Sequence, residues 1–102
     1  MVFMLEKIKS ADVDYLFLAI MTLGDLGELY NFFDDVCTVS EVSEMSKRFK
    51  AAKMLRAGSV YSEISETTGL STATISRVNR CLKYGSGGYE TALGRLEKHE
   101  SP

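Results

Sequence analysis

The sequence predicts an all-α protein that contains a helix-turn-helix and associates with a second copy of itself. Apolar residues recur at helical spacing along nearly the whole chain, and no persuasive strand alternation appears. One early segment is apolar on almost every side, although 102 residues are enough for only one small domain. Two short helical segments meet at Gly69. These three observations define the fold class, and each element can be justified in order.

The first long helix is expected over residues 11–23, with Ser10 as its N-cap and Gly24 as its stop. Its apolar residues surround the helix, and the chain is too short to bury all of them. A second copy packed around this helix resolves the difficulty, and the alternative is a central helix in a compact monomer. The residues expected in the dimer core, including two from the next helix, are Val13, Leu16, Phe17, Ile20, Leu29 and Phe33.

Capping signals define the second and third helices. Asp25 and Glu28 have the spacing of a capping box, with Asp in place of Ser or Thr. Thr38 and Glu41 repeat that spacing at the start of the third helix. This helix should run to about residue 57, where Gly58 is suited to the position after a helix end.

Charge divides the chain into three parts. Residues 1–46 carry two basic and nine acidic side chains, whereas residues 47–84 carry eight basic and two acidic ones. On the third helix, Arg48 and Arg56 lie within or beside the apolar stripe, so they either snorkel or face a groove. The basic middle indicates a polyanion partner, and the alternative is a solvated helical surface.

The helix-turn-helix is predicted at residues 61–84. Gly69 provides the positive φ of the turn, and Ser71 can cap the second helix, residues 72–84, which is here called the reading helix. A glycine-rich joint at 86–88 precedes a final helix at about 89–99. The apolar residues that lock the two helices together are Ile64, Leu70, Ile75 and Val78.

The outer face of the reading helix suits the major groove of double-stranded DNA. Short side chains allow close approach, N–H groups at the helix start can hold a phosphate, and the cations can contact the backbone or a guanine edge. Two copies one helical turn apart would read a palindrome. The expected DNA-binding residues are Ser71, Thr72, Ala73, Thr74, Ser76, Arg77, Asn79, Arg80 and Lys83.

Other functional classes receive less support. A helical module that docks an acidic protein partner on its basic surface is the main alternative to a DNA-binding regulator. We expect no enzyme and no metal site, because His99 is the only histidine and no catalytic constellation is present. Cys37 and Cys81 are expected to be free thiols. The chain offers no membrane span or signal peptide, so a cytoplasmic protein without a membrane partner is expected.

The core segment KRFKAAKMLRAGSVYSEISETTGLSTATISRVNRCLKYG, with LYNFFDDVCT leading in, resembles the Trp repressor family and more closely its YerC/YecD-type branch. ATISR is similar to the family's reading-helix motif. The resemblance implies an intertwined, all-α homodimer of about six helices per chain. Residues 1–102 would form one domain, with dimerisation helices at 11–36 and 89–99 and the DNA-binding part at 59–84. It also implies a transcriptional regulator, expected to be a repressor, bound to an operator.

The resemblance also implies a candidate effector pocket. In the tryptophan-sensing repressor two arginines sandwich the indole of L-tryptophan, and their positions match Arg48 and Arg77. A threonine that helps to hold the ligand carboxylate matches Thr38. Val78 replaces a glycine that leaves room for the indole, and Cys81 replaces a serine that assists the amino group. We therefore expect no cofactor and no L-tryptophan response, with L-tryptophan or another small effector as the alternatives.

Overall fold

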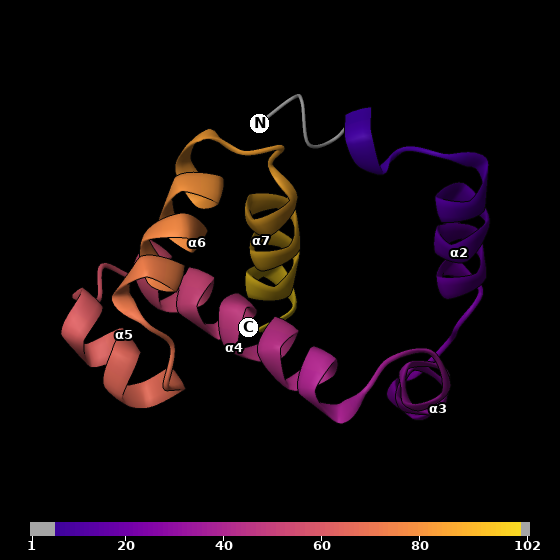
Figure 1. Cartoon of the computed structure of the whole chain (residues 1–102), viewed down its shortest axis with the longest axis horizontal. Helices are drawn as coiled ribbons and strands as arrows, with labels where there is room; N and C mark the ends of the chain where they lie inside the picture. Colours follow the sequence, from indigo (N-terminus) through magenta and orange to yellow (C-terminus); the bar gives the residue numbers. More distant parts are fainter. Residues whose placement is uncertain (1–5, 101–102) are drawn as a thin grey trace. The chain divides into compact units, whose positions relative to one another are not determined.

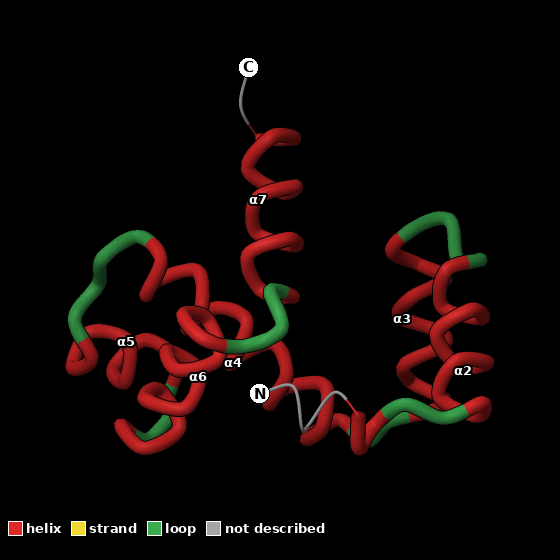
Figure 2. The backbone as a smooth tube through the Cα atoms, turned by 90° about the horizontal axis from the view of Figure 1, so that it is seen from above, coloured by secondary structure: helices red, strands yellow, loops and turns green. Residues whose placement is uncertain are grey.

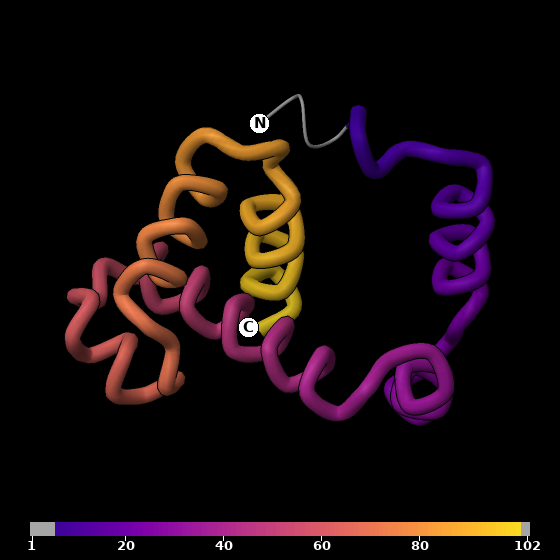
Figure 3. Tube along the Cα trace, in the orientation of Figure 1, coloured from indigo at the N-terminus to yellow at the C-terminus, as the bar shows by residue number. Residues whose placement is uncertain are grey.

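The computed structural model describes residues 6–100, in which no strand occurs (Figures 1 and 2). The predicted all-α fold is therefore confirmed. Residues 6–8 are helical, and the longer helices follow in the order α2 (Ala11–Met21), α3 (Leu26–Val36), α4 (Val39–Arg56), α5 (Tyr61–Thr68), α6 (Thr72–Tyr84) and α7 (Gly88–Glu100). Figure 3 traces the chain through these helices from indigo to yellow.

The chain divides into two compact units between Glu44 and Met45, a boundary that lies inside α4. The N-terminal unit contains α2, α3 and the first turn of α4. The C-terminal unit contains the rest of α4 with α5, α6 and α7. Within the described residues no helix is long and apolar enough to cross a membrane.

Local hydrogen bonds start α2 and α3 where the sequence predicts. The Ser10 hydroxyl accepts a bond of 3.0 Å from the N–H of Val13, which satisfies a donor in the first turn of α2. The Asp25 carboxylate accepts a hydrogen bond of 2.9 Å from the N–H of Glu28. The Glu28 carboxylate accepts one of 2.6 Å from the N–H of Gly24. Helix α2 ends at Met21, two residues before the predicted end.

Taken by itself, the N-terminal unit has largely exposed apolar side chains. Neither α2 nor α3 contains a buried residue. Tyr15 and Met21 are each 79% exposed. Among the expected dimer-core residues, Leu16 and Phe17 are 36% and 51% exposed, and the other four, Val13, Ile20, Leu29 and Phe33, are half-buried.

Helix α4 is closed by a specific motif at each end. At its start, the Thr38 hydroxyl accepts from the N–H of Glu41 at 3.1 Å, and the Glu41 carboxylate accepts from the N–H of Thr38 at 2.8 Å. At its end, Gly58 has φ +91° and donates to the carbonyl of Leu55, while the following N–H donates to the carbonyl of Met54. This is a Schellman arrangement, and it requires the left-handed conformation that glycine adopts without strain.

The described hydrophobic core lies in the C-terminal unit. Helix α6 packs against α5 and α7 there. Ala51 and Ala52 of α4 are fully buried, and their small side chains let other helices approach this part of α4 closely. The core cluster consists of these two alanines with Ile64, Leu70, Ile75, Val78 and Leu93.

Candidate nucleic-acid interface

The turn between α5 and α6 is fixed by backbone conformation and by hydroxyl groups. Gly69 ends α5 in the left-handed region, with φ 77° and ψ 3°. The buried Thr68 hydroxyl donates a hydrogen bond of 2.7 Å to the carbonyl of Ile64 and accepts one of 3.2 Å from the N–H of Leu70. The Ser65 hydroxyl donates 2.8 Å to the carbonyl of Leu70. These bonds satisfy polar groups of a tight turn that would otherwise be buried without partners.

The predicted apolar lock between the two helices is present. Ile64 and Ile75 are fully buried, Val78 is 2% exposed and Leu70 is 5% exposed. Because these four residues come from α5, the turn and α6, they fix the direction of α6 with respect to α5. The geometry is that of a helix-turn-helix.

The start of α6 is capped and carries no acidic side chain in its first turn. The Ser71 hydroxyl accepts a hydrogen bond of 3.1 Å from the N–H of Thr74 and donates one of 3.1 Å to the Thr74 hydroxyl. The N–H groups of Thr72 and Ala73, in the first turn, have no partner within the helix. Together with the helix dipole, they make this end attractive to an anion.

Most of the predicted interface residues lie on the exposed side of α6. Thr74 and Asn79 are half-buried at the edges of this side, and Thr74 is also engaged in the cap. The exposed members of the set are Ser71, Thr72, Ala73, Ser76, Arg77, Arg80 and Lys83. The structure therefore gathers short side chains near the helix start and cations farther along.

Helix α6 ends where a side chain would not fit. A Cβ atom at Gly85 would lie 2.3 Å from the carbonyl oxygen of Cys81, which is backbone and cannot move away cheaply. The Gly85 N–H donates 2.9 Å to that same oxygen. Glycine at this position therefore allows the last turn of α6 to close before the joint to α7.

The candidate effector residues are not all brought together. Val78 is buried in the core, Arg48 and Cys81 are half-buried, and Arg77 is exposed. Thr38 belongs to the N-terminal unit, so no distance to the other four is defined. Beside Cys81 lies a shallow cavity of about 410 Å³, lined by Phe49, Cys81, Ser86, Gly88 and Tyr89.

Tyr89 is a component of this region that the sequence does not reveal. Burial raises the pKa of its hydroxyl above the ordinary value, and the Cys81 thiol adds to the rise. The positive charges of Arg48 and Arg77 oppose it. Both arginines therefore act electrostatically on one tyrosine. In the sequence, Tyr89 is only the first residue of the predicted final helix, and no nearby residue indicates this environment.

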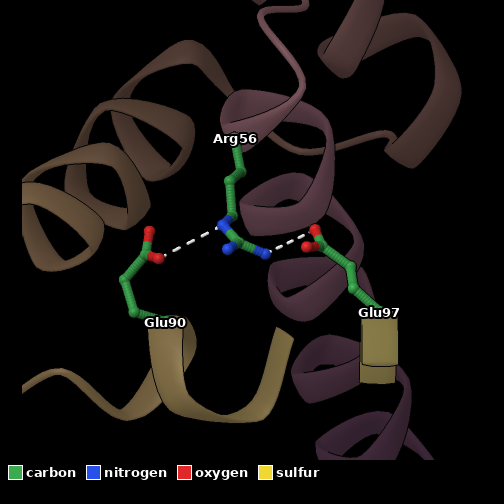
Figure 4. A network of polar contacts seen from close by, with 3 residues as sticks. All are labelled: Arg56, Glu90 and Glu97. Atoms are coloured by element: carbon green, nitrogen blue, oxygen red, sulfur yellow. Dashed lines mark hydrogen bonds and ion pairs between the residues drawn. The ribbon is translucent and has the colours of Figure 1, made fainter. Parts of the chain in front are cut away.

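Arg56, expected either to snorkel or to face a groove, joins α4 to α7 through its guanidinium. Its Nε lies 3.1 Å from Oε2 of Glu90, and its NH1 lies 2.5 Å from Oε1 of Glu97 (Figure 4). Its side chain is 29% exposed, and the two carboxylates are 48% and 61% exposed. Such solvent-exposed pairs contribute at most about 1 kcal/mol each, so they orient α7 more than they stabilise it.

The remaining chemistry-bearing groups form no further site in the described part of the chain. Cys37 and Cys81 are both free and half-buried. Over residues 6–100 no group of three or more His, Cys, Asp or Glu side chains could hold a metal ion. The exposed side of α6 and the Tyr89 region are therefore the two features with a functional interpretation.

Known proteins match this chain over nearly its whole length. The family model for the Trp repressor protein matches residues 11–97. YerC, an uncharacterised protein of Bacillus subtilis (strain 168), is 47% identical over 97 residues, which cover 95% of this chain and 93% of YerC.

Two crystal structures are similar as well. A TrpR-like protein from Eubacterium eligens is 53% identical, with a TM-score of 0.87 over 90% of this chain and 95% of that chain. A candidate Trp repressor from Staphylococcus aureus is 47% identical, with a TM-score of 0.86 over 90% of this chain and 92% of that chain. The family predicted from the reading-helix segment is therefore confirmed, and the chain belongs to the Trp repressor family.

Proposed function

We propose that this protein is a sequence-specific DNA-binding transcriptional regulator that represses from a palindromic operator as a homodimer. The observation that carries the proposal is the exposed side of α6. Its first turn is capped, free of acidic side chains and covered by short ones, and three exposed cations follow. A helix of this kind can enter the major groove with its N-terminal end while cations bind the phosphates on either side.

Each part of α6 has a separate role in this proposal. Thr72, Ala73 and Ser76 approach base edges, with methyl groups against thymine methyls and hydroxyls against polar edges. The free N–H groups of the first turn hold a phosphate. Arg77, Arg80 and Lys83, all exposed, neutralise phosphates or contact a guanine. Half-buried Thr74 and Asn79 contact DNA from the edges of the exposed side.

The homodimer is supported by the uncovered apolar surface of α2 and α3. Monomeric soluble proteins rarely expose a large contiguous apolar patch. A second copy would cover Leu16 and Phe17, which are 36% and 51% exposed. Helices 11–36 and 89–99 would form the dimer, and residues 59–84 would bind DNA. Two copies would then present two reading helices to half-sites one helical turn apart, about 34 Å.

We further propose that neither L-tryptophan nor a cofactor is needed for DNA binding. Val78 supports this because it is 2% exposed and packs in the core, at the position where the resemblance implies a glycine that leaves room for the indole. Tyr89 supports it because it lies within electrostatic reach of both arginines of the candidate effector pocket. The affinity for operator DNA should therefore be the same with and without L-tryptophan.

Selection of bound duplexes from a random oligonucleotide pool tests the function directly. We expect enrichment of palindromic sequences whose half-site centres are about 10–10.5 base pairs apart. Binding to the enriched duplex should persist at moderate salt, whereas binding to random DNA should weaken steeply. If no sequence is enriched and the protein instead captures acidic proteins, the basic surface is a protein-docking surface and the proposal fails.

A matched pair of variants tests the role of the exposed side. Thr72→Asp places a negative charge in the first turn of α6, where it stabilises the helix but repels DNA phosphates. We expect loss of specific binding with an unchanged melting temperature. Ser40→Asp is the control, because Ser40 is also exposed and lies in the first turn of α4, outside the segments proposed to form the dimer and to bind DNA. Equal DNA affinity of the Thr72→Asp variant and the wild type would refute the groove assignment.

A further inference from the structure

Helix α7 begins with an aromatic side chain at a junction of three helices. The joint before it contains Gly87 with φ +85°, and α7 starts at Gly88. Tyr89 is half-buried and packs against the core of the C-terminal unit. Its ring centroid lies 6.2 Å from that of Phe49 on α4, with an angle of 36° between the ring planes. Tyr89 also lines the cavity of about 410 Å³ beside Cys81 of α6.

The support of α6 depends on this junction. Helix α6 packs against α5 and α7. The α5 side is held by Ile64, Ile75 and the turn, which lie near the start of α6. Toward the end of α6, Gly85 and the glycine-rich joint give little rigidity of their own. Two side chains of α7 therefore contribute to the support of α6: Leu93, which is 3% exposed in the core, and Tyr89, which packs against the core.

Charge makes the position of Tyr89 more specific. Arg48 precedes Phe49 on α4, and Arg77 lies one turn before Cys81 on α6. Both positive charges lower the pKa of the Tyr89 hydroxyl, against the larger effect of burial that raises it. The phenol is thus neutral at physiological pH, and the ring rather than the hydroxyl accounts for the packing of Tyr89.

We propose that Tyr89 is a positioning residue whose ring fills the junction of α4, α6 and α7 and holds the reading helix ready for DNA without a bound effector. The ring thus takes the structural role that a bound effector would have. This proposal rests on the DNA-binding function proposed above and adds how the reading helix is kept in its binding orientation.

Removal of the ring should weaken the packing of α6 against α7 without unfolding the core. In Tyr89→Ala, hydrogen exchange should accelerate at the amides of the second half of α6. The apparent DNA affinity should fall roughly tenfold or more, because it scales with the fraction of molecules whose reading helix is in place. Tyr89→Phe keeps the ring, so both properties should stay near the wild-type values.

Chemical rescue separates this role from a general loss of packing. The compound p-cresol reproduces the Tyr89 side chain beyond Cα and should restore both slow exchange in α6 and DNA affinity to Tyr89→Ala. It should change neither property in the wild type. Leu96→Ala is the control, because Leu96 lies on the same helix, is 45% exposed and lines a different groove, between α4 and α7. That variant should not respond to p-cresol.

The outcomes distinguish this proposal from the proposed function. Exchange in α6 is measured without DNA, so it tests the junction even if no operator is found. Unchanged exchange in α6 of Tyr89→Ala, or an increase in wild-type DNA affinity on addition of p-cresol or L-tryptophan, would overturn the proposal while leaving DNA binding intact. If Tyr89→Ala does not fold, Tyr89→Leu replaces it in the exchange and affinity measurements, and the same contrary results apply.

Discussion

Replacement of Arg80 by alanine gives a quantitative test of the proposed DNA contact. Arg80 is exposed on α6, and the substitution removes one cation from each copy of the chain. If each copy neutralises one phosphate with Arg80, the dimer loses two phosphate contacts. The slope of log K against log of the salt concentration then becomes shallower by about 1.8. Between roughly 50 and 200 mM salt, the affinity deficit of the variant should therefore shrink by a factor of about 12.

The assay is fluorescence anisotropy with a duplex enriched by selection, titrated at several salt concentrations. Lys9→Ala serves as the control, because it removes one exposed cation outside the segments proposed to form the dimer and to bind DNA. We expect the slope of this control to equal that of the wild type. The reasoning is refuted if Arg80→Ala retains the full wild-type slope. It is also refuted if both variants shift the slope equally, because the effect would then reflect net charge and not a contact.

Three further predictions concern stability. Ile75→Ala should lower the free energy of unfolding by about 2–5 kcal/mol, since Ile75 is fully buried, and a loss below about 1 kcal/mol in chemical denaturation would contradict its place in the core. The double variant Leu16→Asp with Phe17→Asp should unfold, because the dimer is proposed to be the core of the N-terminal helices; a folded monomer in sedimentation would count against this. Hydrogen bonds from the Thr38 N–H, the larger cause, and from the Thr38 hydroxyl lower the pKa of the Glu41 carboxyl below its ordinary value of 4.5. The ionised carboxylate should therefore stabilise the start of α4 above pH 4.5, and this stabilisation should be lost as the pH falls through the lowered pKa. Carboxyl chemical shifts followed by NMR would show this, and a Glu41 titration at or above 4.5 would rule it out.

Features governed by neighbouring residues could be predicted from the sequence. Ser10, Asp25, Thr38 and Ser71 were all assigned as caps, and each accepts a hydrogen bond from an N–H three residues later. A cap depends on residue type and spacing alone, so no knowledge of the tertiary fold is needed. The exposed side of the reading helix was likewise predictable, because the buried positions of a helix determine the opposite side.

Features governed by distant residues could not be predicted. Arg56 was recognised as an arginine beside an apolar stripe, but Glu97, one of its two partners, lies 41 positions away on α7. Tyr89 is the first residue of the predicted final helix, and nothing near it in the sequence indicates its contact with Phe49 on α4. The hydroxyl of Thr68 was missed as well, because its bond to the Leu70 N–H depends on how the turn folds.

The separation of the uncovered apolar helices from the reading helix has a genetic consequence. Leu16 and Phe17 lie in the N-terminal unit, whereas Thr72 and Arg80 lie in the other. In the proposed dimer, a chain with a damaged reading helix would keep its means of association and would pair with normal chains. Each mixed dimer would bind only half of a palindromic operator. A defective allele would therefore inactivate normal chains as well as its own product, which is a dominant-negative effect.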